Sequence, residues 1–331
     1  MIELSFAQNF SLIALNAQDS NRLTNAKKVA LRCMAAATIL ELYLNNDFKK
    51  QGEILSFEKK SLDNSSLALY QETVLKALLG RSDAINGTLP NLLLKVTKLS
   101  SRILKEIEHS FTVTLKVIDM MEEIPALIGC DLEFVTAGIS VKEYRSNAEV
   151  FIKVAEGFRA DILEDGPLTD ETIMMLYLMK ESGCVFDLFS KEELKRVAER
   201  INELLEHHSL AKLIVEVTIH KTLEAAAKNF LKMKKAAIAT PTGSGLNFTF
   251  PIIERSQSVF IDTEAWFSNK EDRLRDVKAR LEEKGHSFTV IREGDVPLIK
   301  IDNILYEAVP DAKQYRLTVH GVRLRKYPLS L

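Results

Sequence analysis

The sequence predicts a mainly α-helical N-terminal domain with an embedded short β-hairpin, followed by a small α+β C-terminal domain. Apolar residues recur at helical spacing over most of the chain up to about residue 235. A stretch rich in Thr, Pro, Gly and Ser, typical of a linker, follows at residues 239–245. Beyond this stretch the apolar residues alternate as they do in β-strands. We therefore expect domains at residues 1–238 and 246–331.

The helices of the N-terminal domain are predicted from apolar periodicity between capping and breaking residues. Ser190 and Glu193 form a capping box at the start of one helix. Asn86-Gly87 and Gly166-Pro167 interrupt the helical pattern. The expected helices span residues 5–15, 26–45, 65–79, 90–109, 146–161, 170–182, 191–206 and 210–235.

The pattern changes between residues 111 and 144. Apolar and polar residues alternate from Phe111 to Leu115, and the segments 132–135 and 139–141 also have the composition of short strands. We interpret this region as a small hairpin within the helical domain.

The C-terminal domain combines one helix with several strands. Ser268 and Glu271 form a capping pattern, and Gly285 marks the end of the helix that they begin. The expected strands span residues 258–262, 287–292, 298–301, 304–309 and 315–325. This arrangement predicts a small α+β domain.

Composition limits the classes of function. With 331 residues, 46% hydrophobic and 27% charged, the chain has the length and composition of a two-domain soluble protein. The net charge of −2 gives no general attraction to nucleic acid or to acidic surfaces, so any electrostatic function must be local. Cys33, Cys130 and Cys184 lie far apart among apolar neighbours, which predicts buried thiols in a reducing compartment.

The N-terminal sequence predicts a cytoplasmic protein. Residues 1–15 lack the basic segment of a secretory signal peptide. The apolar stretch around Arg32 is shorter than the ~20 residues needed to span a bilayer. Association with a membrane would therefore be peripheral.

Arg32 is the only charged residue between Val29 and Leu40, in a predicted helix that is apolar on nearly every side. Glu41 lies nine residues further on and faces the opposite way at ~100° per residue, so the two cannot pair. An unpaired buried charge is costly. Arg32 therefore either pairs with a distant carboxylate or lies at the rim of a pocket that takes an anionic ligand.

Four basic residues share one face of the predicted helix at 90–109. Lys95, Lys98, Arg102 and Lys105 have the spacing i, i+3, i+7, i+10, which places them within roughly 80° of one another. Such a stripe is typical of a solvated helix face or of a surface that meets an anionic membrane.

The strength of this attraction is limited. At ~1 kcal/mol for each basic residue, four residues give roughly 4 kcal/mol, which corresponds to about millimolar binding. A membrane function therefore also needs a headgroup pocket, avidity from self-association into an oligomer, or apolar insertion. The apolar run Ile124–Ile128 is a candidate for insertion and equally a candidate for the core.

Signatures of enzymes are scarce. Gly243-Ser244-Gly245 lacks the Gly-Lys-Ser/Thr ending of a phosphate-binding loop, and no nucleophile-elbow or His-x-x-x-His pattern is found. We therefore expect a non-enzymatic protein without a cofactor or a metal. A weaker alternative is a hydrolase or nuclease that uses Asp262 and Glu264, at alternate positions of a strand.

The C-terminal stretch 312–331 supports an alternative function. It contains no acidic residue, and Tyr315 and Tyr327 are interleaved with its basic residues. Its basic residues are Lys313, Arg316, Arg323, Arg325 and Lys326. Basic and aromatic residues on presumed strands are typical of nucleic-acid binding. The alternative is therefore a nucleic-acid-associated regulatory protein.

Several apolar motifs occur in a recognisable order along the first 232 residues. They are Leu-Ile-Ala-Leu at 12–15, Leu-Arg-Cys-Met at 31–34, Ile-Leu-Glu-Leu-Tyr-Leu at 39–44, Met-Leu-Tyr-Leu at 175–178, and Lys-Arg-Val with Ile-Asn-Glu-Leu-Leu over 195–205. This succession resembles the Golgi phosphoprotein 3 family. The resemblance implies a mostly helical domain that binds phosphatidylinositol 4-phosphate peripherally on cytoplasmic membrane faces, and adaptor contacts with membrane enzymes in eukaryotic members.

The resemblance also implies a binding site. The family's headgroup pocket uses an arginine on the central helix, which matches Arg32, and a tryptophan just upstream, where this chain has the segment 22–25. Two further family arginines correspond to Thr97 and Ser100, and the family's membrane-inserting hairpin falls between residues 111 and 141. The ligand-binding residues expected for an anionic lipid headgroup or another phosphate-bearing ligand are Arg32, Lys95, Lys98 and Arg102.

Overall fold

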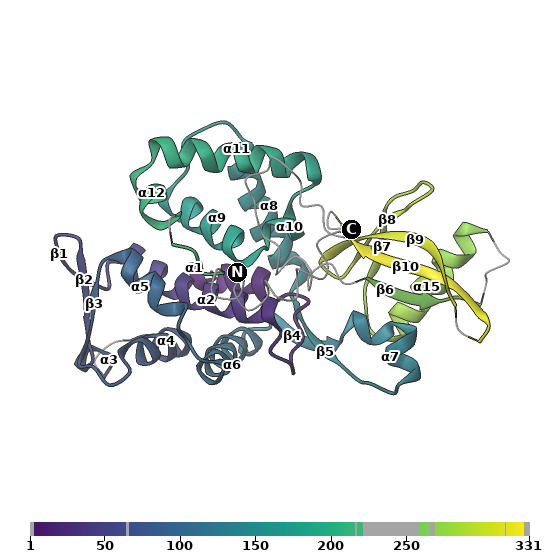
Figure 1. Cartoon of the computed structure of the whole chain (residues 1–331), viewed down its shortest axis with the longest axis horizontal. Coiled ribbons are helices and arrows are strands. Elements are labelled where there is room, and N and C mark those ends of the chain that lie inside the picture. The colour runs from purple at the N-terminus through teal and green to yellow at the C-terminus, as the bar shows by residue number, and fades with distance from the viewer. Residues whose placement is uncertain are drawn as a thin grey trace.

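The structure is a computed structural model that describes residues 3–63, 66–215, 217–220, 258–264, 269–314 and 316–327. The expected linker at 239–245 and the end of the expected helix 210–235 lie outside the described residues. The fold class is confirmed: an N-terminal part made mainly of helices adjoins a C-terminal antiparallel sheet with its helix (Figure 1). A short two-stranded sheet lies where the two parts meet (Figure 1).

Helix α2 (Asn25–Leu44) is the centre of the helical part. Thr24 begins it by accepting a hydrogen bond from the backbone N–H of Lys27. Its apolar residues are buried around its whole circumference, as expected for a helix inside a protein. In the described part of the chain, the helices that pack most closely on it are α1 (Phe6–Leu15), α4 (Leu69–Leu79), α5 (Leu89–Val96), α6 (Ser101–Val117) and α9 (Asp170–Ser182).

The other helices of this part are α3 (Lys60–Asp63), α8 (Ala148–Leu163), α10 (Val185–Leu188), α11 (Lys191–His207) and α12 (Ser209–Val215). The capping box predicted at Ser190 and Glu193 is present at the start of α11. A three-stranded antiparallel sheet was not predicted: β1 (Lys49–Gln51), β2 (Ile54–Glu58) and β3 (Ala84–Gly87). Strands this short contain too few residues for alternation to be recognised.

The helix predicted at 90–109 is wrong as a continuous element. Helix α5 ends at Val96, and α6 begins after Ser100, whose side chain accepts a hydrogen bond from the N–H of Ile103. Helix α6 then continues to Val117, so the segment from Phe111 to Leu115 is helical rather than a strand. Both of these residues are fully buried, because residues four apart share one face of a helix.

The expected hairpin exists, but its strands lie elsewhere. Strands β4 (Met121–Pro125) and β5 (Lys142–Ser146) pair antiparallel. Between them lie the 3₁₀ helix η1 (Leu127–Cys130) and helix α7 (Leu132–Thr136). The segment 132–135 is therefore helical, and the segment 139–141 precedes β5. Asp131 begins α7 by accepting a hydrogen bond from the N–H of Glu133.

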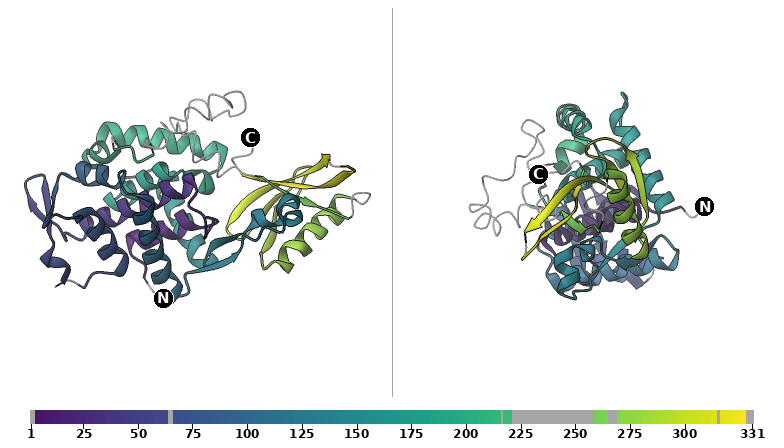
Figure 2. Two further views of the ribbon diagram at one scale, coloured as in Figure 1. Left: turned by 60° about the horizontal axis from the view of Figure 1, so that its bottom comes forward. Right: turned by 90° about the vertical axis from the view of Figure 1, so that its right-hand side faces the viewer.

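The C-terminal sheet has the strand order β6-β10-β9-β8-β7 and is antiparallel throughout. Its strands are β6 (Val259–Asp262), β7 (Phe288–Arg292), β8 (Leu298–Ile301), β9 (Ile304–Gln314) and β10 (Thr318–Lys326). Helix α15 (Lys270–Glu283) packs on the sheet through Val277 and Leu281 (Figure 2). Asn269 caps this helix through the N–H of Asp272, and the predicted cap, Ser268, lies outside the described residues.

The helical part and the sheet have separate cores, and the segment after β4 joins the second core. One apolar cluster lies within the helical part, and another combines the sheet residues with Leu127 of η1. Strand β5 connects the two parts because its side chains alternate between them. Among the described residues no helix is both long and apolar enough to cross a membrane.

Candidate functional site

Arg32 lies on α2, and none of the described carboxylates pairs with it. Its Nη2 atom donates one long hydrogen bond of 3.4 Å to the backbone oxygen of Leu99. Its Nε and Nη1 atoms are buried and have no hydrogen-bond partner among the described residues. Burial lowers the pKa of the guanidinium from its ordinary value. Within the described part of the chain, the expectation that Arg32 pairs with a distant carboxylate is therefore wrong.

One further predicted residue, Lys98, belongs to the turn that Arg32 contacts through Leu99. Leu99 lies in the turn between α5 and α6 and directly follows the exposed Lys98. Lys95 is in the last turn of α5 and reaches back to the backbone oxygen of Asn86, at 3.4 Å. The turn that Arg32 contacts therefore carries Lys98, while Lys95 contacts another segment.

Arg102 and Lys105 lie on α6, beyond the break between the two helices. The Nε atom of Arg102 is 3.1 Å from a carboxylate oxygen of Glu106, and 89% of the Arg102 side chain is exposed. Arg102 also lines a groove of about 1120 Å³ beside α4 and α6, whose lining includes neither Arg32 nor Lys98. The four predicted basic residues therefore do not form a single stripe.

The beginning of α6 adds positive potential around Leu99. Ser100 caps this helix, and its first turn contains no acidic residue. The N-terminus of a helix carries the equivalent of about half a positive charge. Arg32, Lys98 and the start of α6 thus present positive potential on one side of the helical part.

The apolar run from Ile124 to Ile128 lies largely in the interior. Ile124, Ala126 and Leu127 are 6%, 2% and 5% exposed. Leu127 belongs to the core of the C-terminal sheet. This run therefore contributes to the packing between the two parts, and the interpretation as an exposed insertion segment is wrong for these three residues.

The basic residues of the C-terminal stretch are largely engaged within the protein. Lys313 lies 3.2 Å from the carboxylate of Asp131, and Lys326 lies 2.7 Å from that of Asp187. Arg323 forms an ion pair with Asp311. These carboxylates neutralise charges that the nucleic-acid alternative needs on the surface, so no observation favours that alternative.

The proposed nuclease carboxylates are also engaged. Asp262 lies 3.1 Å and Glu264 lies 3.9 Å from the guanidinium of Arg280 on α15. An arginine between two carboxylates occupies the position that a catalytic cation would need. This arrangement is typical of an ion pair that attaches a helix to a sheet.

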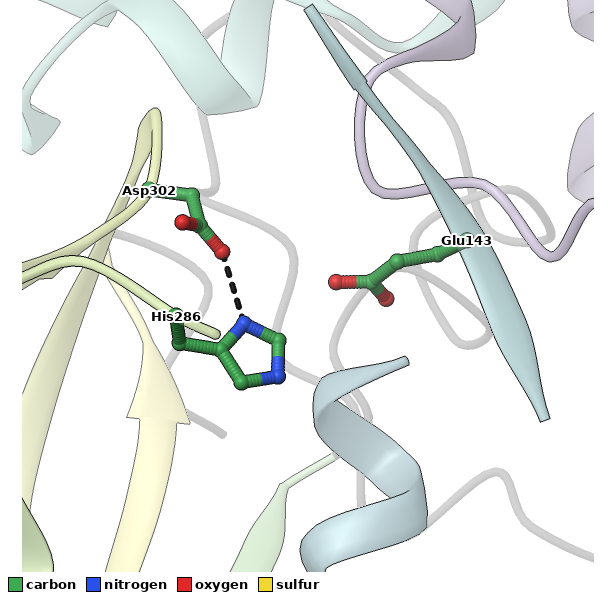
Figure 3. A group of neighbouring side chains, drawn as sticks. All are labelled: Glu143, His286 and Asp302. Atoms are coloured by element: carbon green, nitrogen blue, oxygen red, sulfur yellow. Dashed lines mark hydrogen bonds and ion pairs between the residues drawn. The ribbon is translucent and has the colours of Figure 1, made fainter. Parts of the chain in front are cut away.

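A second group of ionisable residues, which sequence reasoning missed, lies where the two parts meet. Glu143 extends from β5 toward the imidazole of His286, and Asp302 contacts the same ring (Figure 3). One potential ligand atom from each residue lies within 4.8 Å of the other two. The three residues are far apart in the sequence, so no motif marks them.

Alternation along β5 explains why Glu143 is found here. Tyr144 and Ser146 face the helical part, where their hydroxyls bond to the carboxylate of Glu108 and the backbone oxygen of Leu12. Glu143 and Arg145 therefore face the C-terminal part.

The hydrogen bonds of Asp302 favour an ion-pair group rather than a metal centre. One carboxylate oxygen accepts from the Nδ1 atom of His286 at 2.8 Å. The other accepts from Arg145 at 3.0 Å and from the backbone N–H of Ser287 at 3.0 Å. Glu143, His286 and Asp302 together offer ligand atoms that a divalent cation can use. A cation at Asp302, however, would have to displace these donors and would be repelled by Arg145.

The pKa values of this group have definite causes. Burial raises the pKa of Glu143 to about 7. Burial also lowers the pKa of His286, but the hydrogen bond to Asp302 and the neighbouring Cys130 outweigh it and raise this pKa to about 9. Burial raises the pKa of Asp302, yet the bonds from His286, Ser287 and Arg145 lower it overall.

We expect the folded protein to lose stability as pH rises from about 5 to 9. The folded pKa values of Glu143 and His286, about 7 and about 9, exceed their ordinary values of 4.5 and 6.5. Both groups therefore stabilise the native state fully below the unfolded pKa, and this stability is lost as pH rises through the folded pKa. Each contribution is on the order of 3 kcal/mol. Urea unfolding at pH 5, 7 and 9 measures the decline.

Two substitutions separate the two steps of this decline. Glu143→Gln should remove the step at lower pH, and His286→Asn should remove the one at higher pH. The exposed His109 provides the matched control, since His109→Asn should leave both steps in place. A stability that is constant between pH 5 and 9 in the wild-type protein would contradict this expectation.

Comparison with known proteins adds no family to this description. No protein-family model matches the chain, and no curated protein matches it. The protein is therefore described by its fold and its sites: a helical part adjoins a small α+β part, and the guanidinium of Arg32 on the central helix has two buried nitrogen atoms without an acceptor among the described residues.

Proposed function

We propose that the chain binds a phosphate-bearing anion through Arg32, and that this anion is the headgroup of a phosphoinositide-type lipid at a membrane surface. The observation that supports this proposal is the Arg32 guanidinium, whose Nε and Nη1 atoms are buried without a hydrogen-bond partner among the described residues. The one hydrogen bond that Arg32 makes within the described part of the chain is long, at 3.4 Å to the backbone oxygen of Leu99. The choice of headgroup comes from the resemblance of the first 232 residues to the Golgi phosphoprotein 3 family.

The energetics of an unpaired guanidinium favour an anion. Leaving a buried donor without an acceptor costs about 1–3 kcal/mol, and more when the donor is charged. The donors of arginine form a planar fork that matches the oxygens of a phosphate. Arg32 is partly exposed, so a ligand can approach this side chain from the solvent.

The surroundings of Arg32 supply attraction over a longer range. Lys98 and the start of α6 are positive and lie beside Leu99, and Lys105 and Arg102 are exposed further along α6. At ~1 kcal/mol for each residue near an anionic leaflet, these charges alone give only weak binding. We therefore propose a peripheral, non-enzymatic protein in which Arg32 provides the specific contact and the surrounding charges steer the chain to the surface.

Arg32→Gln is expected to reduce binding to lipid vesicles that contain phosphatidylinositol 4-phosphate by about tenfold or more. Loss of charge-assisted hydrogen bonds worth about 1.5–3 kcal/mol has this consequence, because 1.4 kcal/mol corresponds to a factor of ten. Arg32→Lys keeps the charge but loses the planar fork of donors, so its affinity for the vesicles should lie between those of the wild-type and Arg32→Gln proteins. Co-sedimentation with vesicles at several lipid concentrations measures the affinity.

The controls distinguish binding at Arg32 from general electrostatic attraction to an anionic surface. Arg81→Gln removes an exposed arginine elsewhere on the helical part and should change binding less than about twofold. Vesicles of phosphatidylcholine alone test for binding to neutral lipid, and phosphatidylserine vesicles test for charge without a phosphomonoester. Inorganic phosphate, as a competitor, distinguishes a lipid site from a phosphate site. Equal binding to neutral vesicles, or unchanged binding by a folded Arg32→Gln protein, would refute the proposal.

A further inference from the structure

A cavity of about 410 Å³ lies where the helical part meets the C-terminal sheet. It is lined by residues of both parts, including Glu143 of β5, Leu127 of η1 and Tyr306 of β9. This volume falls in the range of small-molecule sites, which is roughly 300–1000 Å³. The cavity is separate from Arg32, which is not among its lining residues.

Both basic residues that line the cavity are already paired with carboxylates. Arg22 forms an ion pair with Asp19, three residues earlier in the chain. The amino group of Lys326 lies 2.7 Å from the carboxylate of Asp187. These two pairs are neutral together, so they give the cavity no net attraction for an anion.

Glu143 and Tyr306 are two ionisable groups of the lining for which the described residues provide no such partner. Among the described residues, the Glu143 carboxyl has no ion pair and no side-chain hydrogen bond, and its hydrogen-bonding contact is the backbone N–H of Leu127. The Tyr306 side chain is buried, with the residue 7% exposed, and its hydroxyl has no hydrogen-bond partner in the described part of the chain. Burial raises the pKa of this hydroxyl, so it stays neutral.

The charges that surround Glu143 balance one another without it. The imidazolium of His286 pairs with Asp302 at 2.8 Å, and the guanidinium of Arg145 lies 2.9 Å from Glu122. Arg145 also bridges to Asp302, which links the two pairs. When Glu143 ionises, its negative charge is therefore the unbalanced charge at the cavity.

We propose that this cavity binds a small organic ammonium ion, with Glu143 as its counter-charge and the Tyr306 hydroxyl as a hydrogen-bond acceptor. The N–H groups of an ammonium ion can donate to the Glu143 carboxylate and to the Tyr306 hydroxyl oxygen. Its positive charge also offsets the cost of burying an unpaired carboxylate. The apolar side chains of Leu23, Leu127 and Val259 in the lining provide contacts for a carbon body on the amine. An anion is excluded because it would face Glu143 while both cations of the lining are already paired.

Three probes of nearly equal size and different charge test the proposal: benzylammonium, benzyl alcohol and benzoate. Isothermal titration of the full chain at pH 8 measures each affinity. Benzylammonium should bind, and the other two should bind at least about tenfold more weakly, since neither can pair with Glu143. The proposal is overturned if benzoate or benzyl alcohol binds as well as benzylammonium, or if benzylammonium does not bind at millimolar concentration.

Substitutions identify the groups responsible. Glu143→Gln should reduce benzylammonium binding by about tenfold or more, and Tyr306→Phe by about two- to fivefold. Glu123→Gln changes a carboxylate on the neighbouring strand that pairs with Lys116, outside the cavity, and should have no effect. Unchanged binding by a folded Glu143→Gln protein overturns the proposal.

Titration of Glu143 gives a further test on the unaltered chain, which holds even if the Gln variant does not fold. Because the pKa of Glu143 is about 7, lowering the pH from 8 to 6 should weaken benzylammonium binding about tenfold. The charged groups that also face this carboxylate are His286, Asp302 and Lys326. His286 keeps its charge between pH 6 and 8 because its pKa is about 9. Affinity that is constant between pH 6 and 8 overturns the assignment of Glu143 as the counter-charge.

Discussion

Replacing Lys27 with methionine is expected to lower the free energy of unfolding by about 3–5 kcal/mol. The Lys27 side chain is 1% exposed and forms an ion pair with Glu108, which is 9% exposed. The same carboxylate accepts a hydrogen bond of 2.8 Å from the Tyr144 hydroxyl. Methionine has a similar volume but no charge, so the substitution removes the ion-pair partner of Glu108 in the core. Urea unfolding, followed by the circular dichroism of the helices, measures the change.

A second substitution tests the cause of this loss. Lys27→Met combined with Glu108→Gln should recover a substantial part of the lost stability, because an amide carries no charge and still accepts from Tyr144. Lys28→Met, at the next and more exposed position, should change the unfolding free energy by about 0.5 kcal/mol or less. If Lys27→Met is as stable as the wild-type protein, the pair with Glu108 does not stabilise the helical part.

Glu41→Ala is expected to destabilise the protein by a similar amount, about 3–5 kcal/mol. Glu41 is 2% exposed, and its carboxylate accepts three hydrogen bonds. The donors are the backbone N–H of Ala7 at 2.7 Å, the Tyr70 hydroxyl at 2.7 Å and the Gln71 side-chain amide at 2.6 Å. One carboxylate thus connects α1, α2 and α4, and alanine would remove the acceptor of all three donors, of which, among the described residues, the Tyr70 hydroxyl alone keeps a second partner, the Ser5 hydroxyl at 2.8 Å.

The matched control is Glu72→Ala on α4. Glu72 forms an ion pair with Lys76 on the surface, with 37% of its side chain exposed. Exposed pairs four residues apart contribute about 0.3–0.5 kcal/mol, so this control should be nearly neutral. The stability of Glu41→Gln should fall between those of Glu41→Ala and Glu72→Ala, because the amide of glutamine retains one acceptor oxygen. Equal stability of the two alanine variants would show that the buried network is not stabilising.

Much of the fold could be predicted from local sequence because its causes are local. The capping box at Ser190 and Glu193 and the strands after residue 287 were predicted and are present. Where local signals were ambiguous, the prediction failed. The segment from Phe111 to Leu115 alternates as a strand does, yet its first and last residues are also four apart and pack as one helical face.

The basic stripe shows how a single cap changes a predicted site. Lys95 and Arg102 share a face only if the helix is continuous between them. Ser100 instead accepts a hydrogen bond from the N–H of Ile103 and begins a new helix. A serine followed three residues later by an apolar residue is a weak signal for a cap, so the break could not be separated from a continuous helix.

The partners of the buried charges were beyond local reasoning. The isolation of Arg32 and Glu41 in one apolar helix predicted that each needs a partner elsewhere. Among the described residues, Glu41 has three hydrogen-bond donors and Arg32 has a single long hydrogen bond. The same pattern of isolated charge therefore had two different outcomes.

By itself the sequence determined which segments form helices and strands in most of the chain, and that a lone arginine lies in an apolar helix. These properties follow from periodicity and capping, which depend on residues a few positions apart. Only the tertiary structure decided which charges are neutralised. Pairs such as Lys27 with Glu108, or Arg145 with Asp302, join residues distant in the sequence. They meet only when the helices and the sheet pack, because burial then makes each unpaired charge costly.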